Sequence, residues 1–248
     1  MYDWATAKLA DVEAEQAQFI ALVIGEFSNL IQQFPLGSQA TNLEIAITGY
    51  EVALILFTRE NHSENWAMTQ NNLGTAYLYR IRGERAENIE SAIASFQAAL
   101  EVYTREALPQ NHAGTQFNLG LAYRNAQQLD NAYHAFATAI DTVEFQRVEI
   151  SLGTANDADK QKLAEEWNSL YSNMIEVCLE LADNTQAWEY IERSKTRNLI
   201  ELLTSRSLYP DGEIPTQIKS QLQQLQQEIL IEQRGSIPFW KQHHRKQR

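Results

Sequence analysis

The chain reads Asn42-Leu-Glu-Ile-Ala-Ile-Thr-Gly-Tyr-Glu-Val-Ala-Leu and then, 46 residues later, Asn88-Ile-Glu-Ser-Ala-Ile-Ala-Ser-Phe-Gln-Ala-Ala-Leu. The same offset relates Thr69-Gln-Asn-Asn-Leu-Gly-Thr-Ala-Tyr to Thr115-Gln-Phe-Asn-Leu-Gly-Leu-Ala-Tyr. Self-similarity at a fixed period of this size is typical of proteins built from stacked structural repeats. The internal repeat therefore decides the fold.

Each copy combines Leu-Gly-x-x-Tyr with a later Ala-x-x-x-aromatic-x-x-Ala, and both spacings place their residues on one face of an α-helix. Small Gly and Ala side chains suit the point where two helices cross closely, while Leu, Tyr and Phe fill the volume between neighbouring units. The chain has only ten Gly and five Pro in 248 residues, so long helices can run without interruption. We expect an all-α protein of paired helices, in which Asn42 and Asn88 cap helix starts.

This combination of spacings resembles the tetratricopeptide repeat, a helix-turn-helix unit of about 34 residues. The resemblance implies a right-handed superhelical stack of helical hairpins, and the wider spacings found here imply long helices. Four units are expected within a repeat domain over 1–204, at about 18–58, 66–104, 113–148 and 167–204, with a loop insertion at about 149–162. A C-terminal helix over 205–234 and a disordered basic tail over 235–248 complete the predicted organisation.

A wider likeness covers about 42–233. The strings Trp66-Ala-Met-Thr-Gln-Asn-Asn-Leu-Gly and Ala187-Trp-Glu-Tyr-Ile-Glu-Arg-Ser-Lys-Thr-Arg-Asn-Leu-Ile-Glu-Leu-Leu resemble cyanobacterial proteins in which tetratricopeptide units precede a caspase-like CHAT domain. The Asn-Asn-Leu pattern is also similar to kinesin light chains, which bind extended peptides. A caspase-like domain requires a His and Cys dyad on a separate α/β sheet, whereas Cys178 lies in a predicted helix. The resemblance therefore does not carry protease activity to this chain.

The first helix of each unit is expected to line the concave side of such a stack, with residues around Leu73 and Leu119 pointing inward. Amide side chains there can satisfy the donors and acceptors of an extended peptide. The alternative is that they solvate a face or bridge adjacent helices. We expect a protein or peptide partner to contact Asn71, Asn72, Thr75, Leu78, Tyr79, Phe117, Asn118, Leu121, Arg124 and Asn125.

Two further clusters each have two interpretations. Three arginines, Arg80, Arg82 and Arg85, either meet acidic ligand groups or pair with Glu84, Glu87 and Glu90, and the pairing is the expected outcome because it is usual for surface charges. Near the C-terminus an apolar seam repeats at helical spacing and either caps the stack or associates with a second chain; it consists of Ile218, Leu222, Leu225 and Ile229.

Composition narrows the classes of function. The formal net charge of −12 argues against a nucleic acid partner, which would need a basic face. No apolar run approaches the ~20 residues that span a bilayer, and the N-terminus lacks the layout of a secretory signal. We therefore expect a cytoplasmic protein without a membrane partner. The single cysteine, Cys178, excludes an internal disulfide, and we expect it to pack as a small apolar residue.

The sequence contains no Gly-rich phosphate loop, no His-Glu-x-x-His pair and no paired acid and base. We expect a scaffold that is not an enzyme and that holds no cofactor and no metal. Two other functions stay open at this stage. One is a regulatory fragment of a CHAT-type protease system, and the other is a helical repeat that senses a small molecule between its groove and the predicted loop.

Overall fold

The computed structural model describes residues 13–152 and 157–205, together with 220, 221 and 224. Every regular element in these residues is an α-helix, which confirms the all-α prediction for the described part of the chain. None of its helices is long and apolar enough to cross a membrane. The helices are α2 (Ala14–Gln33), α3 (Gln39–Leu56), α4 (Ser63–Leu78), α5 (Arg85–Leu100), α6 (Pro109–Asn125), α7 (Leu129–Leu152), α8 (Asp157–Glu180) and α9 (Asn184–Ser205).

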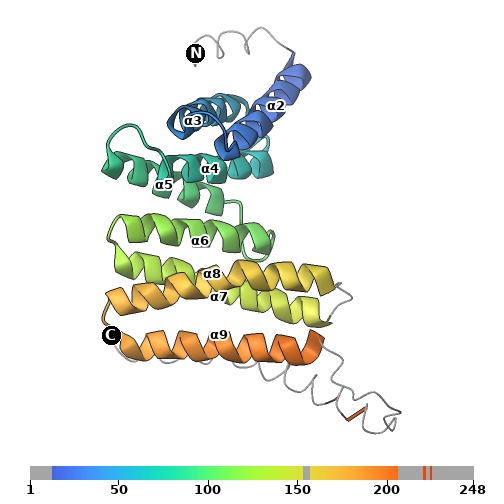
Figure 1. Ribbon diagram of the computed structural model, residues 1–248. Coiled ribbons are helices and arrows are strands. Elements are labelled where there is room, and N and C mark those ends of the chain that lie inside the picture. Colours follow the sequence, from blue (N-terminus) through green and yellow to red (C-terminus); the bar gives the residue numbers. More distant parts are fainter. Residues whose placement is uncertain (1–12, 153–156, 206–219, 222–223, 225–248) are drawn as a thin grey trace.

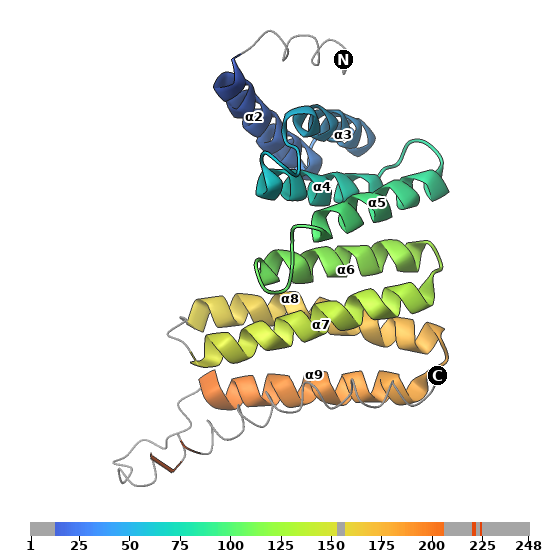
Figure 2. The same ribbon diagram turned by 180° about the vertical axis from the view of Figure 1, so that it is seen from behind.

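The helices are stacked in sequence order, with α2 at one end and α9 at the other (Figure 1). Each helix packs against its neighbours in the chain, and α2, α4, α6 and α8 also contact one another in succession. Helix α8 covers α7 in Figure 1, whereas α7 covers α8 in the reverse view of Figure 2. The stack therefore has a side formed by α4, α6 and α8, which we call the even-numbered side.

The helix boundaries repeat with the same offset as the sequence. Helices α3 and α5 begin 46 residues apart, at Gln39 and Arg85, and so do α4 and α6, at Ser63 and Pro109. The turn between α4 and α5 covers residues 79–84, whereas the turn between α6 and α7 covers only 126–128. The α4–α5 unit therefore has a longer turn than the α6–α7 unit. Helix α5 also has more residues before Ala92 than α7 has before the equivalent Ala132.

The glycine of each Leu-Gly-x-x-Tyr stretch lies where the two helices of a hairpin cross. A Cβ added at Gly74 would lie 2.8 Å from the ring of Phe96, and one added at Gly120 would lie 2.5 Å from the ring of Phe136. Both rings are fully buried. In the first hairpin, formed by α2 and α3, the glycine at the crossing is Gly49 on the second helix. A Cβ added there would overlap the Ser28 hydroxyl of α2. Close helix crossing thus explains why small residues repeat.

The two asparagines that open the repeated stretch do not cap their helices. Asn42 lies inside the first turn of α3, which begins after the N-cap Ser38. Its amide donates to the carbonyls of Phe34 and Leu36, at 3.2 and 3.1 Å. The amide of Asn88 likewise donates to the carbonyl of Arg82, at 2.8 Å. The capping prediction is wrong because these buried amides satisfy carbonyls of the preceding turn, which would otherwise lack partners.

The predicted loop at about 149–162 is also wrong over most of its length. Helix α7 continues to Leu152 and α8 begins at Asp157, so only residues 153–156 separate the two helices. Asp157 and Asp159, two of the residues that suggested a loop, fall in the first turn of α8, and acidic residues are favourable near the positive end of a helix. The predicted seam Ile218, Leu222, Leu225 and Ile229 lies outside the described residues, as do 206–219 and 225–248.

The core consists of a series of clusters between adjacent helices. The largest joins α6, α7, α8 and α9 around the buried Phe136, Ile140 and Met174. Cys178 belongs to it and is fully buried, which confirms that it packs as a small apolar residue. A second cluster joins α3 to α4 around Tyr50. Such a chain of local clusters is typical of proteins in which each unit contacts only its neighbours.

Candidate functional site

Amide side chains connect α4 to α6 on the even-numbered side. The Asn71 carboxamide oxygen accepts from the Thr115 hydroxyl at 3.1 Å and from the Asn118 amide at 3.4 Å. The Asn71 amide donates to the Asn72 carboxamide oxygen at 3.4 Å, and the Thr75 hydroxyl donates to the Asn71 carbonyl at 3.0 Å. We call Asn71, Asn72 and Asn118 the amide row. Its asparagines are half-buried, so they bridge the two helices and still reach the surface.

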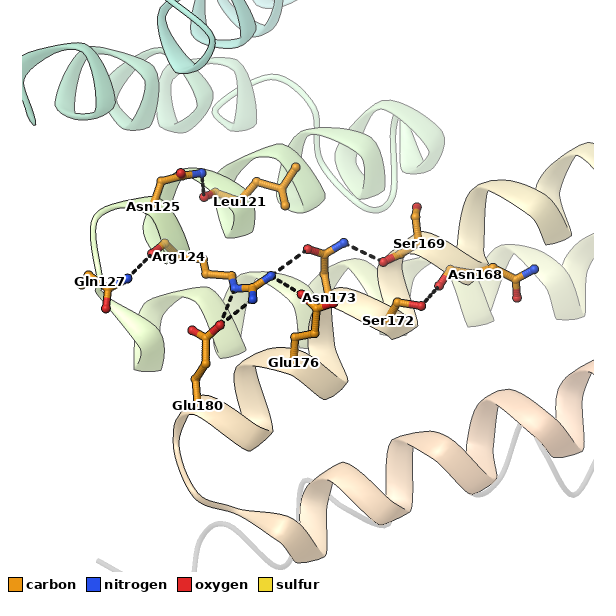
Figure 3. Close-up of polar contacts among 10 residues, drawn as sticks. All are labelled: Leu121, Arg124, Asn125, Gln127, Asn168, Ser169, Ser172, Asn173, Glu176 and Glu180. Carbon is orange, nitrogen blue, oxygen red and sulfur yellow. Dashed lines mark hydrogen bonds and ion pairs between the residues drawn. The ribbon is translucent and has the colours of Figure 1, made fainter. Parts of the chain in front are cut away.

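A charged cluster connects α6 to α8 on the same side (Figure 3). The Arg124 guanidinium donates to Glu180 at 2.5 and 2.9 Å, to Glu176 at 2.5 Å and to the Asn173 carboxamide oxygen at 3.3 Å. Asn173 in turn donates to the carbonyl of Ser169 at 2.8 Å. We call Arg124, Asn173, Glu176 and Glu180 the Arg124 cluster. It fixes Arg124 against α8, so this side chain does not extend freely into solvent.

The Arg124 cluster carries excess negative charge. One guanidinium faces two carboxylates, those of Glu176 and Glu180. Hydrogen bonding to Glu180 raises the pKa of Arg124, so the guanidinium stays charged at every accessible pH. Glu176 remains 55% exposed at its side chain, which leaves this carboxylate open to a cation from outside the protein.

The remaining residues predicted to contact a partner are a buried leucine, two half-buried apolar residues, and two residues at helix ends. Leu78 is buried in the cluster formed with Phe96 and Leu119, so its prediction as a groove residue is wrong. Phe117 and Leu121 are half-buried and pack against the core, where the Phe117 ring lies 5.8 Å from that of Phe136. They therefore offer only part of their surface to a partner.

Tyr79 and Asn125 lie at the ends of α4 and α6. Tyr79 is exposed and forms the C-cap of α4, seven residues after Asn72. The Asn125 amide donates to the carbonyl of Leu121 at 2.8 Å (Figure 3), and its carboxamide oxygen accepts from Arg85 at 3.1 Å. Asn125 therefore bonds within α6 and to Arg85, the first residue of α5 after the turn at 79–84.

The arginines near that turn make contacts that differ from the expected pairs. Arg80 forms a two-pronged interaction with Glu44 of α3, at 2.8 and 2.7 Å, and Arg82 donates to the Thr41 hydroxyl at 3.3 Å. Arg85 donates to the carbonyl of Leu78 at 2.5 Å. Among the described contacts they do not pair with Glu84, Glu87 or Glu90, because these arginines reach across to adjacent helices.

Nucleophilic chemistry has little support in the described part of the chain. The Cys178 thiol is fully buried, and burial raises its pKa to about 11, so almost none is ionised near neutral pH. No group of three or more His, Cys, Asp or Glu side chains is placed to hold a metal ion within residues 13–152 and 157–205. The even-numbered side presents hydrogen-bonding groups and negative charge at its surface.

Sequence reasoning missed Thr115 and every member of the Arg124 cluster except Arg124 itself. Asn173, Glu176 and Glu180 lie on α8, whose unit lacks the Leu-Gly-x-x-Tyr stretch and does not keep the 46-residue offset. Thr115 could have been found from the repeat, because Thr69 holds the same place 46 residues earlier. The structure shows that both side chains are buried. A scan against protein-family models finds no match to this chain, and neither does a search of curated proteins.

Proposed function

We propose that the chain is a non-catalytic scaffold that binds an extended segment of a partner protein across α4, α6 and α8. The binding surface has three parts. The half-buried Phe117 and Leu121 lie along the middle of α6, the amide row lies toward α4, and the Arg124 cluster lies toward α8. An apolar centre flanked by polar groups is the usual composition of a protein interface.

The observation that carries this proposal is the hydrogen-bonding capacity left in the amide row. The Asn72 amide nitrogen and the Asn118 carboxamide oxygen have no protein partner among the described residues, although both side chains are held in place by Asn71. Two fixed amides that together offer one donor and one acceptor match the peptide units of an extended chain. Preorganisation of this kind reduces the entropy lost on binding.

The charge of the surface selects the chemistry of the partner. The Arg124 cluster has an exposed carboxylate at Glu176, and the whole chain has a formal net charge of −12. Complementary charges speed association and reject like-charged partners. The segment is therefore expected to carry Lys or Arg at the end that approaches α8.

A selection from a library of random extended peptides tests this proposal. Selected peptides are expected to be enriched in Lys and Arg, and to bind an Asn72→Ala, Asn118→Ala variant roughly fivefold to 150-fold more weakly, since the variant loses two hydrogen bonds of about 0.5–1.5 kcal/mol each. Isothermal titration calorimetry measures the change. Phe117 is left intact because its ring packs against the core.

The matched control is Asn131→Ala on α7. Asn131 is exposed and bonds only locally to Gln128, at 2.9 Å, so its replacement is expected to leave peptide affinity unchanged. Equal binding of the selected peptides to wild type and to the double variant would contradict the proposed site. Enrichment of acidic peptides would contradict the proposed charge selection.

A further inference from the structure

Helix α2 exposes an apolar face at one end of the stack. Phe19, Val23, Phe27 and Leu30 are 68%, 52%, 55% and 69% exposed, and they recur every three or four residues. We call these four residues the α2 face. Its opposite side, which includes the buried Ala21 and Ser28, packs against α3. Exposed apolar patches of this continuity mark interaction sites in soluble proteins.

The internal repeat identifies what the α2 face is built to contact. With the 46-residue offset, Phe27 and Leu30 correspond to Leu73 and Ala76 of α4, and a second offset leads to Leu119 and Ala122 of α6. These four equivalents are at most 6% exposed. Leu73 and Ala76 pack on α3, while Leu119 and Ala122 pack on α5. In α4 and in α6, this face therefore packs against the odd-numbered helix that comes immediately before it in the chain.

Helix α8 follows the same rule. Met174 and Val177 are fully buried in the cluster that contains Phe136 and Ile140 of the preceding helix, α7. Three of the even-numbered helices thus bury this face against an odd-numbered helix, and α2 alone leaves it exposed among the described helices. The face of α2 therefore has the geometry to receive an odd-numbered helix.

The opposite end of the stack presents such a helix. Trp188 of α9 follows Ala187 as Ile47 follows Ala46 and Ile93 follows Ala92. Ile47 packs with Leu73 and Ala76 of the next helix, and Ile93 packs with Leu119 and Ala122. Trp188 instead is 62% exposed. Helix α9 therefore has an exposed aromatic side chain at the position by which α3 and α5 contact their successors.

We propose that two copies of this chain associate head to tail, with the α2 face of one copy packed against Trp188 of α9 in the other. The contact repeats between molecules the packing that joins α3 to α4 and α5 to α6 within one molecule. It is heterologous, so each copy keeps one free end and further copies add in the same way. Association also extends the even-numbered side from one copy to the next.

Two variants that each destroy one end test this arrangement. Phe27→Glu is expected to disable the α2 face, and Trp188→Glu is expected to disable α9. Wild type should show a weight-average mass that rises with concentration beyond that of a dimer, whereas each variant alone should stay at the mass of one chain. An equimolar mixture of the two variants should form a dimer and nothing larger, because one intact end of each kind remains. Analytical ultracentrifugation measures wild type, each variant alone and the mixture.

Ile81→Glu is the matched control, since Ile81 is 60% exposed but lies in the turn before α5. It should associate as wild type does. Circular dichroism establishes that each variant keeps its helices, and Phe27→Gln replaces Phe27→Glu if the latter unfolds. The proposal fails if wild type stays at the mass of one chain up to its solubility limit. It also fails if Trp188→Glu still dimerises, which indicates an α2 to α2 contact, or if only a Leu222→Glu, Ile229→Glu variant abolishes association.

Discussion

At the scale of single residues, two glycines of α6 differ sharply in their surroundings. Gly120 crosses Phe136 so closely that an added Cβ would lie 2.5 Å from the ring, whereas an added Cβ at Gly114 would meet nothing within 4 Å. Both occupy the same helix, so replacement by Ala brings the same gain in helix propensity, about 1 kcal/mol. The two substitutions therefore separate helix propensity from the cost of steric overlap.

We predict that Gly120→Ala destabilises the protein and that Gly114→Ala stabilises it. Overlap with a buried ring costs about 1–3 kcal/mol, which exceeds the propensity gain in all but the mildest case. At Gly114 only the gain remains. Urea denaturation followed by circular dichroism gives both changes in unfolding free energy. Equal stabilisation by the two substitutions would show that α6 and α7 can separate without cost at their crossing.

At the scale of elements, a buried ion pair joins the last three helices. Arg193 of α9 donates to Glu144 of α7 at 2.7 Å, and the Tyr171 hydroxyl of α8 donates to the same carboxylate at 2.5 Å. The Glu144 side chain is 4% exposed. Removing one partner of a buried ion pair is generally unfavourable, although the intact pair itself contributes little net stability. The three helices are thus fixed relative to one another through one carboxylate.

We predict that Arg193→Met lowers the unfolding free energy by about 1.5–3 kcal/mol, because the buried Glu144 carboxylate loses a hydrogen bond from a charged donor. Adding Glu144→Gln should restore part of the loss, since a neutral amide costs less to bury than a carboxylate. Lys195→Met on the same helix is the control, because its ion pair with Glu192 is exposed on both sides and its loss should leave the melting temperature unchanged. Thermal denaturation compares the variants. A double variant less stable than Arg193→Met would contradict this account.

At the scale of the whole molecule, the core is a series of local clusters and stability should be local as well. Cys178 reports on the α6 to α9 cluster, because it is fully buried and its raised pKa keeps the thiol unreactive. Tyr50 belongs to the α3 to α4 cluster and donates to Gln32 at 2.9 Å. The two residues lie in different units, so damage at one need not reach the other.

We predict that Tyr50→Ala, which removes a buried aromatic ring at a cost of about 3–5 kcal/mol, leaves the labelling rate of Cys178 by a thiol reagent unchanged. Met174→Ala should accelerate labelling, because Met174 is fully buried in the same cluster as Cys178. Absorbance or mass spectrometry follows the reaction. Acceleration of labelling by Tyr50→Ala to the same degree as by Met174→Ala would indicate that the stack unfolds as one cooperative body.

The sequence by itself determined the all-α class, the positions of the hairpins and the small residues at their crossings. These properties are local, because the spacing of Leu, Gly, Tyr and Ala along one helix sets which face is buried and how closely the next helix can approach. The burial of Cys178 was predicted for a similar reason, since small apolar residues within a helical pattern usually pack inside. The expected bounds of the first three units lie within four residues of the observed helix pairs, whereas α8 begins at Asp157, ten residues before the expected start of the fourth unit.

Only the tertiary structure decided which polar groups meet. Asn71 bonds to Thr115 more than forty residues away in the chain, and Arg124 pairs with carboxylates of α8 at a still longer separation. Such partners depend on how neighbouring units are placed, and α8 does not keep the repeat offset that would have indicated them. The exposure of the α2 face was equally inaccessible, because a helical stripe of apolar residues reads the same whether or not another helix covers it.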